Sequence, residues 1–173
     1  PKPSSAAADV YKRQVVRRFG KINLEVMGEV PEELEVFYHT NTLKELCSLR
    51  AYFKEKGNKV DKIDCWIRMV ATNRLTGHSR GFFSVYTLPP NQAVSAIRQQ
   101  TINEKRNQVP EYRNVKELII RKSKSLFKDL ENGNFESFKN YGKKSKIVIG
   151  SSTEIKGIKA GSVSLAVTSP PFL

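Results

Sequence analysis

Apolar residues recur with helical spacing along most of the chain before its C-terminal part. In residues 42–57, two leucines and a phenylalanine fall at positions i, i+3 and i+7, which predicts a helix with one apolar face. Thr42 and Glu45 have the spacing of a capping box, in which each side chain accepts a hydrogen bond from a backbone N–H of the first turn. Gly57 suits the left-handed conformation that ends many helices, so the pattern predicts both boundaries.

Three further helices follow from the same pattern. They are predicted at 61–74, 92–106 and 115–131, with Asp61, Asn91 and Asn114 as N-terminal caps. Residues 76–95 hold two glycines, two prolines and the rings of Phe82, Phe83 and Tyr86, which predicts an ordered loop with a short extended piece. These rings could stack on nucleic acid, although core packing is the interpretation that we favour. The lysine-, glycine- and asparagine-rich residues 132–146 are predicted to form a connector.

The pattern changes near the C-terminus. Residues 146–150 and 163–168 are short β-branched runs that predict strands, and the segment between them predicts a short helix and a turn. Strand, short helix, strand is the beginning of a parallel sheet. We therefore expect an α/β fold class, in which a mostly helical region leads into the edge of an incomplete sheet, and a chain that is cut short.

The chain divides into three segments on this interpretation. Residues 1–14 are small, polar and without periodic pattern, which predicts a disordered tail. Their sequence also resembles a translated cloning or sequencing scar, so we exclude these residues from the expected fold. Residues 15–145 are predicted to be a basic helical region, and residues 146–173 a partial α/β core.

The charge favours a polyanionic partner. The formal net charge is +13, from 30 Lys and Arg against 17 Asp and Glu, so nucleic acid is the first candidate and a merely solvated basic surface is the alternative. No apolar run approaches the ~20 residues of a membrane span, so we expect no membrane. Two cysteines without CxxC spacing do not suggest zinc or disulfides, and no metal is expected. Without a secretory signal, a cytoplasmic location is expected.

Basic residues on two predicted helices are the candidate phosphate contacts. They are Lys116, Arg121, Lys122, Lys124 and Lys128 on the helix at 115–131, and Arg98, Lys105 and Arg106 on the helix at 92–106. Ordinary solvated helix faces are the alternative for both sets. Gln99 or Gln100 could read adenine edges, though polar helices are common. His78 could touch phosphate or act as a base, but His78 and His39 are interpreted as structural or exposed histidines.

The last strand runs into Thr-Ser-Pro-Pro-Phe. Pro170 and Pro171 cannot donate to a β-ladder, so they end the strand and leave backbone carbonyls free. A flat base with an exocyclic amino group fits this place, because the Ser169 hydroxyl and a proline carbonyl can accept its two hydrogens while Phe172 stacks on the ring. A base reached in this way must leave the double helix.

The stretch KIVIGSSTEIKGIKAGSVSLAVTSPPFL resembles the amino-methylating DNA methyltransferases. Ser169, Pro170, Pro171 and Phe172 match their catalytic motif position by position. The stretch ATNRLTGHSRGFFSVYTLPPNQAVS is more loosely similar to one bacterial and archaeal branch of the same enzymes. The resemblance implies a Rossmann-like sheet, S-adenosylmethionine as cofactor, double-stranded DNA as partner and a site-specific restriction-modification or orphan enzyme. Serine at the first motif position favours cytosine-N4 over adenine-N6 as the methylated atom.

One departure from the family pattern concerns the cofactor. The Phe-x-Gly-x-Gly-like loop that binds S-adenosylmethionine in this family does not occur in residues 1–173. We expect it upstream of Phe19 in a longer protein, and we expect this chain alone to be inactive. Two alternatives stay open: a non-catalytic basic helical module that binds nucleic acid, and a methyltransferase acting on RNA or on a protein amide. The recognition sequence and the oligomeric state are not predicted.

Overall fold

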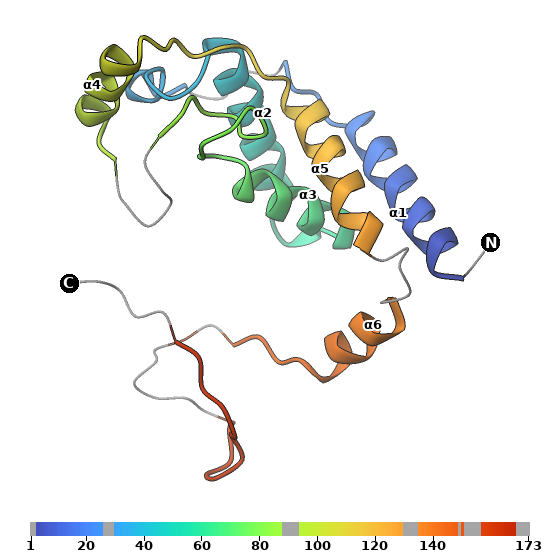
Figure 1. The fold of residues 1–173 in the computed structure, drawn as a ribbon. Coiled ribbons are helices and arrows are strands. Elements are labelled where there is room, and N and C mark those ends of the chain that lie inside the picture. The colour runs from blue at the N-terminus through green and yellow to red at the C-terminus, as the bar shows by residue number, and fades with distance from the viewer. Residues whose placement is uncertain are drawn as a thin grey trace. The chain divides into compact units, whose positions relative to one another are not determined.

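The computed structural model describes residues 3–25, 30–87, 94–129, 135–148, 150 and 157–168. The chain splits into two compact units, Pro1–Phe138 and Lys139–Leu173. The helices in the described residues are α1 (Pro3–Phe19), η1 (Glu32–Leu34), α2 (Thr40–Lys56), η2 (Gly57–Lys59), α3 (Lys62–Asn73), α4 (Ala96–Arg106), α5 (Val115–Asp129) and α6 (Phe135–Lys144), as Figure 1 shows. The mostly helical character predicted for residues 15–145 is confirmed for those of them that the structure describes.

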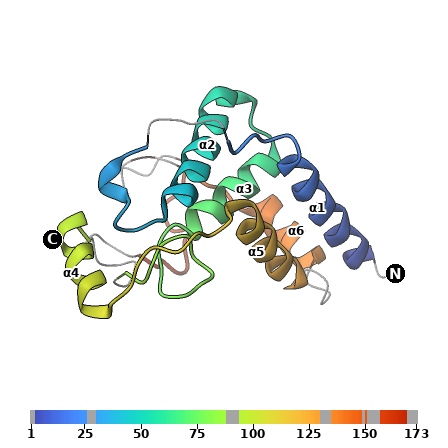
Figure 2. The same ribbon diagram turned by 90° about the horizontal axis from the view of Figure 1, so that it is seen from above.

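The core of the first unit lies between α1, α3 and α5, which pack on one another, and α2 also contacts α5. Figure 2 shows the same grouping from above, with α4 set apart from it. Each helix buries one stripe of side chains, because apolar residues three, four or seven apart share a face. The stripes include Val15 and Phe19 of α1, Ile67 and Val70 of α3, and Val115 and Ile119 of α5.

Residues 3–14, which were predicted to belong to a disordered tail, form the first part of helix α1. The helix continues without a break to Phe19. Ala8 is fully buried, and the ring of Tyr11 lies against the ring of Phe127 with centroids 6.1 Å apart. Alanine is the best helix former, and small side chains allow close packing, so a segment without a polar–apolar pattern still forms a helix here.

The N-terminus of α2 differs from the predicted capping box. The cap is His39, whose Nδ1 accepts a hydrogen bond from the Asn41 backbone N–H at 3.1 Å. Thr42 and Glu45 instead bind the segment before α5: the Thr42 hydroxyl donates to the Arg113 carbonyl at 2.9 Å. The helix ends at Gly57 as predicted, and its positive φ of +50° favours glycine, although its ψ of −120° differs from that of a left-handed helical residue.

The other helix boundaries were predicted with mixed success. Asp61 caps α3 as expected, and Asn114 caps α5 through a hydrogen bond from the Glu117 N–H to its Oδ1 at 2.9 Å. The helix expected from residue 92 begins later, at Ala96, with Ser95 as its cap; Asn91 lies outside the described residues. The predicted connector at 132–146 contains helix α6.

The predicted strands are not formed by the residues that the structure describes. Residues 146–148 and 163–168 have no ladder, and Ile147, Leu165 and Val167 are 93%, 80% and 88% exposed. A strand is stable only when its backbone groups pair with a neighbour and its apolar face is covered, and these runs have neither. The sheet of the expected α/β fold therefore stays a prediction. Most of the short helix expected between the runs lies outside the described residues.

No described helix is both long enough and apolar enough to cross a bilayer.

Candidate nucleic-acid interface

The four residues predicted to carry catalysis have no described geometry. Ser169, Pro170, Pro171 and Phe172 lie outside the residues that the structure describes. The predicted phosphate contacts are all described, so the candidate interface is built from them.

Helix α5 is a firmly held platform for its basic residues. The Trp66 ring stacks on Phe127 with centroids 4.6 Å apart and planes 13° apart. The Trp66 indole N–H donates to the Ser123 hydroxyl at 2.9 Å. At the other end, a Glu45 carboxylate oxygen accepts the Val115 backbone N–H at 2.8 Å. Both ends of α5 are thus tied to α2 and α3, which fixes the direction of its outer face.

Three of the five predicted basic residues share that outer face. Arg121, Lys124 and Lys128 fall at i, i+3 and i+7, and all three are exposed. Within the described residues none of them has a hydrogen bond or an ion pair. Glu117 lies one turn before Arg121 and is also exposed. We call Arg121, Lys124 and Lys128 the α5 stripe.

The other two predicted basic residues of α5 are not part of the stripe. Lys122 is half-buried and lies about 100° around the helix axis from Arg121. Lys116 is exposed in the first turn, but it is offset from the row by its register. The structure therefore brings together Arg121, Lys124 and Lys128 from the predicted set, and it separates Lys116 and Lys122 from them.

Helix α4 carries the remaining predicted contacts in a different place. Arg98 is exposed, and Arg106 lies with its guanidinium carbon 3.7 Å from the centroid of the Tyr86 ring. Gln99 is fully buried and donates to the Tyr86 carbonyl at 2.9 Å and to Asn103 at 2.7 Å. Gln99 therefore cannot read a base edge. In both ribbon views α4 lies apart from α5 (Figures 1 and 2), so the predicted cations form two groups.

Arg113 holds part of the loop between α3 and α4 in place. One guanidinium nitrogen of Arg113 donates to the carbonyls of Ser79, Phe82 and Ser84 at 3.2, 2.6 and 2.7 Å. Burial lowers the pKa of Arg113 from its ordinary value. These bonds fix the path of residues 79–84. No local sequence signal pointed to Arg113, because its partners lie about thirty residues away in the chain.

The aromatic residues of this loop have two different roles. Phe83 is buried, which confirms core packing for that ring. The Arg74 guanidinium lies 4.1 Å from the Phe82 ring centroid. On Tyr86, the ring of His78 lies at 5.2 Å from the ring centroid, in addition to the Arg106 contact. Phe82 and Tyr86 therefore hold cationic groups at the surface.

The histidine side chains are both accounted for by structural contacts. His78 is exposed, and its Nδ1 lies 2.9 Å from the Thr87 carbonyl; because a carbonyl only accepts, Nδ1 carries the proton. His39 caps α2 and meets the edge of the Tyr112 ring at 5.8 Å. Both agree with the structural interpretation of the sequence.

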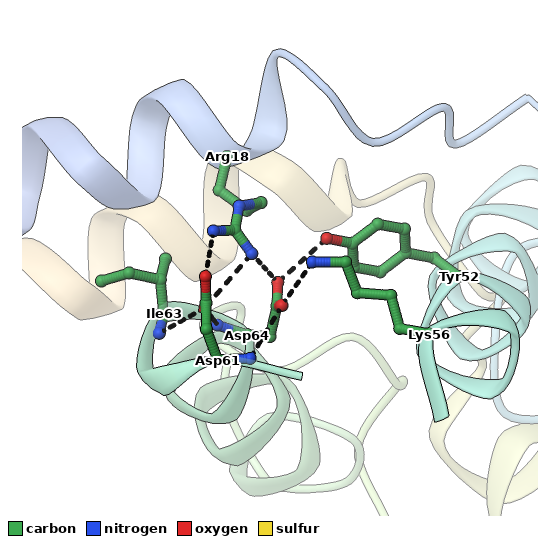
Figure 3. Close-up of polar contacts among 6 residues, drawn as sticks. All are labelled: Arg18, Tyr52, Lys56, Asp61, Ile63 and Asp64. Carbon is green, nitrogen blue, oxygen red and sulfur yellow. Dashed lines mark hydrogen bonds and ion pairs between the residues drawn. The ribbon is translucent and has the colours of Figure 1, made fainter. Parts of the chain in front are cut away.

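A network of charged residues joins α1, α2 and α3 (Figure 3). The buried carboxylate of Asp64 accepts hydrogen bonds from Arg18, from Lys56 at 2.6 Å and from the Tyr52 hydroxyl at 2.9 Å. Arg18 also forms an ion pair with Asp61 at 2.5 Å. The cations of this network are thus used within the fold, in contrast to those of the α5 stripe. In the sequence, only the spacing of Asp61 and Asp64 gives any indication of this network.

The network changes the acidity of its members. The Arg18 guanidinium holds the pKa of Asp61 well below its usual range. Burial opposes ionisation of Asp64, but hydrogen bonds from Lys56 and Arg18 outweigh it, so the pKa of Asp64 is lowered. The same contacts raise the pKa of Lys56. Asp61, Asp64 and Lys56 are therefore charged at neutral pH, so the contacts between the carboxylates and the cations of the network are ion pairs.

The described residues hold no group of three His, Cys, Asp or Glu side chains placed to bind a metal ion. Cys47 and Cys65 are both free thiols. Comparison of the chain with family models, with curated proteins and with solved structures found no match.

Proposed function

We propose that this chain belongs to an S-adenosylmethionine-dependent DNA amino-methyltransferase and that its helical unit binds the DNA backbone through the α5 stripe. The observation that carries the binding part is the stripe itself. Arg121, Lys124 and Lys128 are exposed on one face of a helix whose two ends are tied to the core, and no described carboxylate forms an ion pair with them.

The dimensions of the stripe suit a nucleic-acid strand. Seven residues separate Arg121 from Lys128, which is about 10 Å along the axis at a rise of about 1.5 Å per residue. Duplex DNA carries one charge per strand for about every 3.4 Å of its axis, but the strand also winds around that axis, so neighbouring phosphates lie farther apart than this. The long side chains of the stripe must therefore spread along the strand to reach one phosphate each. The backbone of α5 is already ordered, so binding costs the conformational freedom of the three long side chains and not that of the chain that carries them.

The methyl-transfer part rests on the sequence. Ser169 and a carbonyl of Pro170 or Pro171 would accept hydrogen bonds from the exocyclic amino group of a flipped base, and Phe172 would stack on its ring. Cytosine-N4 is favoured over adenine-N6 by the serine. S-adenosylmethionine supplies the methyl group, and we assign no residue of this chain to its binding.

The alternative is a basic helical module that binds nucleic acid without chemistry. It shares the α5 stripe with the leading proposal, and it differs in giving Ser169 and Phe172 no role. The two proposals therefore make the same prediction for DNA binding and opposite predictions for methylation.

DNA binding is tested by fluorescence anisotropy with a labelled duplex over a range of salt concentrations. The variant R121Q/K124Q/K128Q removes the stripe, and K21Q/K54Q/K59Q removes three exposed cations elsewhere in the same unit as a control of equal charge. Each phosphate contact contributes about 0.9 to the slope of log affinity against log salt, so the stripe variant should lower the slope by about 2.7. The control should leave the slope near that of the wild type.

Two results would contradict the proposal. One is a wild-type chain that does not bind duplex DNA. The other is an equal change of slope in the two triple variants, which would mean that only net charge matters and that the stripe is not a contact surface.

A further inference from the structure

We propose that residues 74–87, together with the end of α4, bind a further phosphate group of the DNA backbone. Arg106 is the group that binds it, and Arg74 and Arg80 add positive charge from residues 74–87; we call these three residues the loop cluster. This inference rests on the proposed DNA binding, and it adds a site that is separate from the α5 stripe.

Arg106 is held by a ring and by no described carboxylate. Its guanidinium carbon lies 3.7 Å from the Tyr86 ring centroid, and among the described residues no acceptor takes its N–H groups. Stacking on an aromatic face orients the guanidinium plane and leaves the donors on its edge available. Phosphate oxygens are the usual partners for such a fork of donors.

Arg74 and Arg80 add positive charge to the same loop. Arg74 lies over the Phe82 ring at 4.1 Å and uses two of its nitrogens on Asn73. Arg80 is exposed and has no partner within the described residues. Residues 74–87 contain no aspartate or glutamate, so no carboxylate of the loop competes with a phosphate.

The geometry favours a backbone phosphate over a base. Tyr86 already contacts Arg106 and His78, and Phe82 already lies against Arg74. The Phe82 ring also lies against Gly77, so close that a Cβ atom on residue 77 would be 2.5 Å from the ring carbons. These rings are therefore taken up within the loop, and the groups left for a ligand are the charged edges.

The cluster is also held in place before any ligand arrives. Arg113 binds three carbonyls of the loop, as described above. The Tyr86 carbonyl accepts from the side-chain amides of Gln99 and Gln108, both at 2.9 Å. Tyr86 is also bridged to Gly77. A site that needs little reorganisation keeps more of its interaction energy for binding.

The experiment compares single variants of the full chain in the duplex-binding assay. Arg106→Gln removes the stacked cation, and Lys59→Gln removes an exposed cation of η2 as the matched control. Tyr86→Leu keeps every formal charge and removes the ring that contacts Arg106 and His78, while the backbone carbonyl that binds Gln99 stays. Thermal unfolding of each variant verifies that the fold is kept.

We expect Arg106→Gln to lower the salt slope by about 0.9, which is about a 3.5-fold smaller loss of affinity between about 50 and 200 mM salt. Lys59→Gln should leave the slope unchanged. Tyr86→Leu should weaken binding roughly threefold without any change in net charge, because Arg106 loses its orienting surface. An electrostatic surface without a defined site would not respond to this variant.

The inference is overturned if Arg106→Gln and Lys59→Gln behave alike, or if Tyr86→Leu binds as the wild type does. The stripe variant R121Q/K124Q/K128Q, measured in parallel, separates this failure from that of the proposed function. If only the stripe variant loses binding, the loop cluster is wrong and the proposed DNA binding stands. If the wild type does not bind duplex DNA, both are wrong.

Discussion

Replacing Asp64 with asparagine should destabilise the helical unit more than any other change of one carboxylate to an amide among the described residues. The two Asp64 oxygens accept from four donors: Arg18 and Tyr52 on Oδ1, and Lys56 and the Asp61 backbone N–H on Oδ2. Asparagine is isosteric, but its nitrogen cannot accept. Two of the four donors would therefore lose their partner, and two cations would lose the negative charge that lies between them.

The magnitude follows from the burial of the network. Removing one partner of a fully buried ion pair costs about 3–5 kcal/mol. Asp64 is fully buried, but the side chains of Arg18 and Lys56 are 19% and 30% exposed and can regain water. We therefore expect a loss of about 2–3 kcal/mol for Asp64→Asn, which is roughly 8–12 °C in melting temperature for a unit of this size.

The assay is thermal and urea unfolding followed by circular dichroism. Asp9→Asn is the matched control, because Asp9 makes an exposed pair with Lys12 at 3.4 Å, and such pairs contribute at most about 1 kcal/mol. Equal melting temperatures for the two variants would refute the reasoning. The pH dependence gives a second check: the folded-state pKa values of Asp61 and Asp64 are lowered, so their stabilisation is present above the unfolded value of about 4 and is lost as the pH falls further. The difference between wild type and Asp64→Asn should shrink below that pH.

Two further substitutions test the contacts that hold the loop and α5. Thr42→Val should cost about 2–3 kcal/mol in urea unfolding, because the buried hydroxyl bonds both the N–H and the carbonyl of Arg113, and valine leaves both unpaired; an unchanged midpoint would contradict this. Gly77→Ala should cost about 1–3 kcal/mol because its methyl group would meet the Phe82 ring, whereas Gly142→Ala, with open space around it, should not destabilise the fold; similar losses in both would show that the Gly77 contact is not limiting.

Features set by neighbouring residues were predictable from the sequence. Asp61 and Asn114 were identified as caps because a cap acts within its own first turn. Gly57 was predictable because a left-handed residue at a helix end has few alternatives to glycine. The apolar periodicity located α2, α3 and α5 for the same local reason.

Features that depend on distant partners were missed. Thr42 and Glu45 have the residue types of a capping box, but their hydrogen bonds go to Arg113 and Val115, about seventy residues away. The same residue types satisfy local and distant groups equally well, so spacing alone could not decide. Arg18 meets Asp61 and Asp64 only because α1 packs on α3, which the sequence did not reveal.

The sequence predicted which residues belong to the candidate interface, but not how they are arranged in space. The exposed cations of α5 were identified, but half-buried Lys122 could be separated from Arg121 only once the buried face of the helix was known. Arg106 was also identified, while its contact with Tyr86 depends on how the loop folds back on α4. The predicted strands are not formed by the described residues, because a strand needs paired neighbours that these residues do not provide.

The central claim is tested most directly by methylated bases in DNA. The complete reading frame that contains this sequence would be expressed as wild type and as Ser169→Ala, and the host DNA hydrolysed and analysed for N4-methylcytosine and N6-methyladenine by mass spectrometry. We predict N4-methylcytosine with the wild type and its loss with Ser169→Ala, while duplex binding by the variant is kept. Neither methylated base with the wild type, or equal amounts with both proteins, would contradict the account.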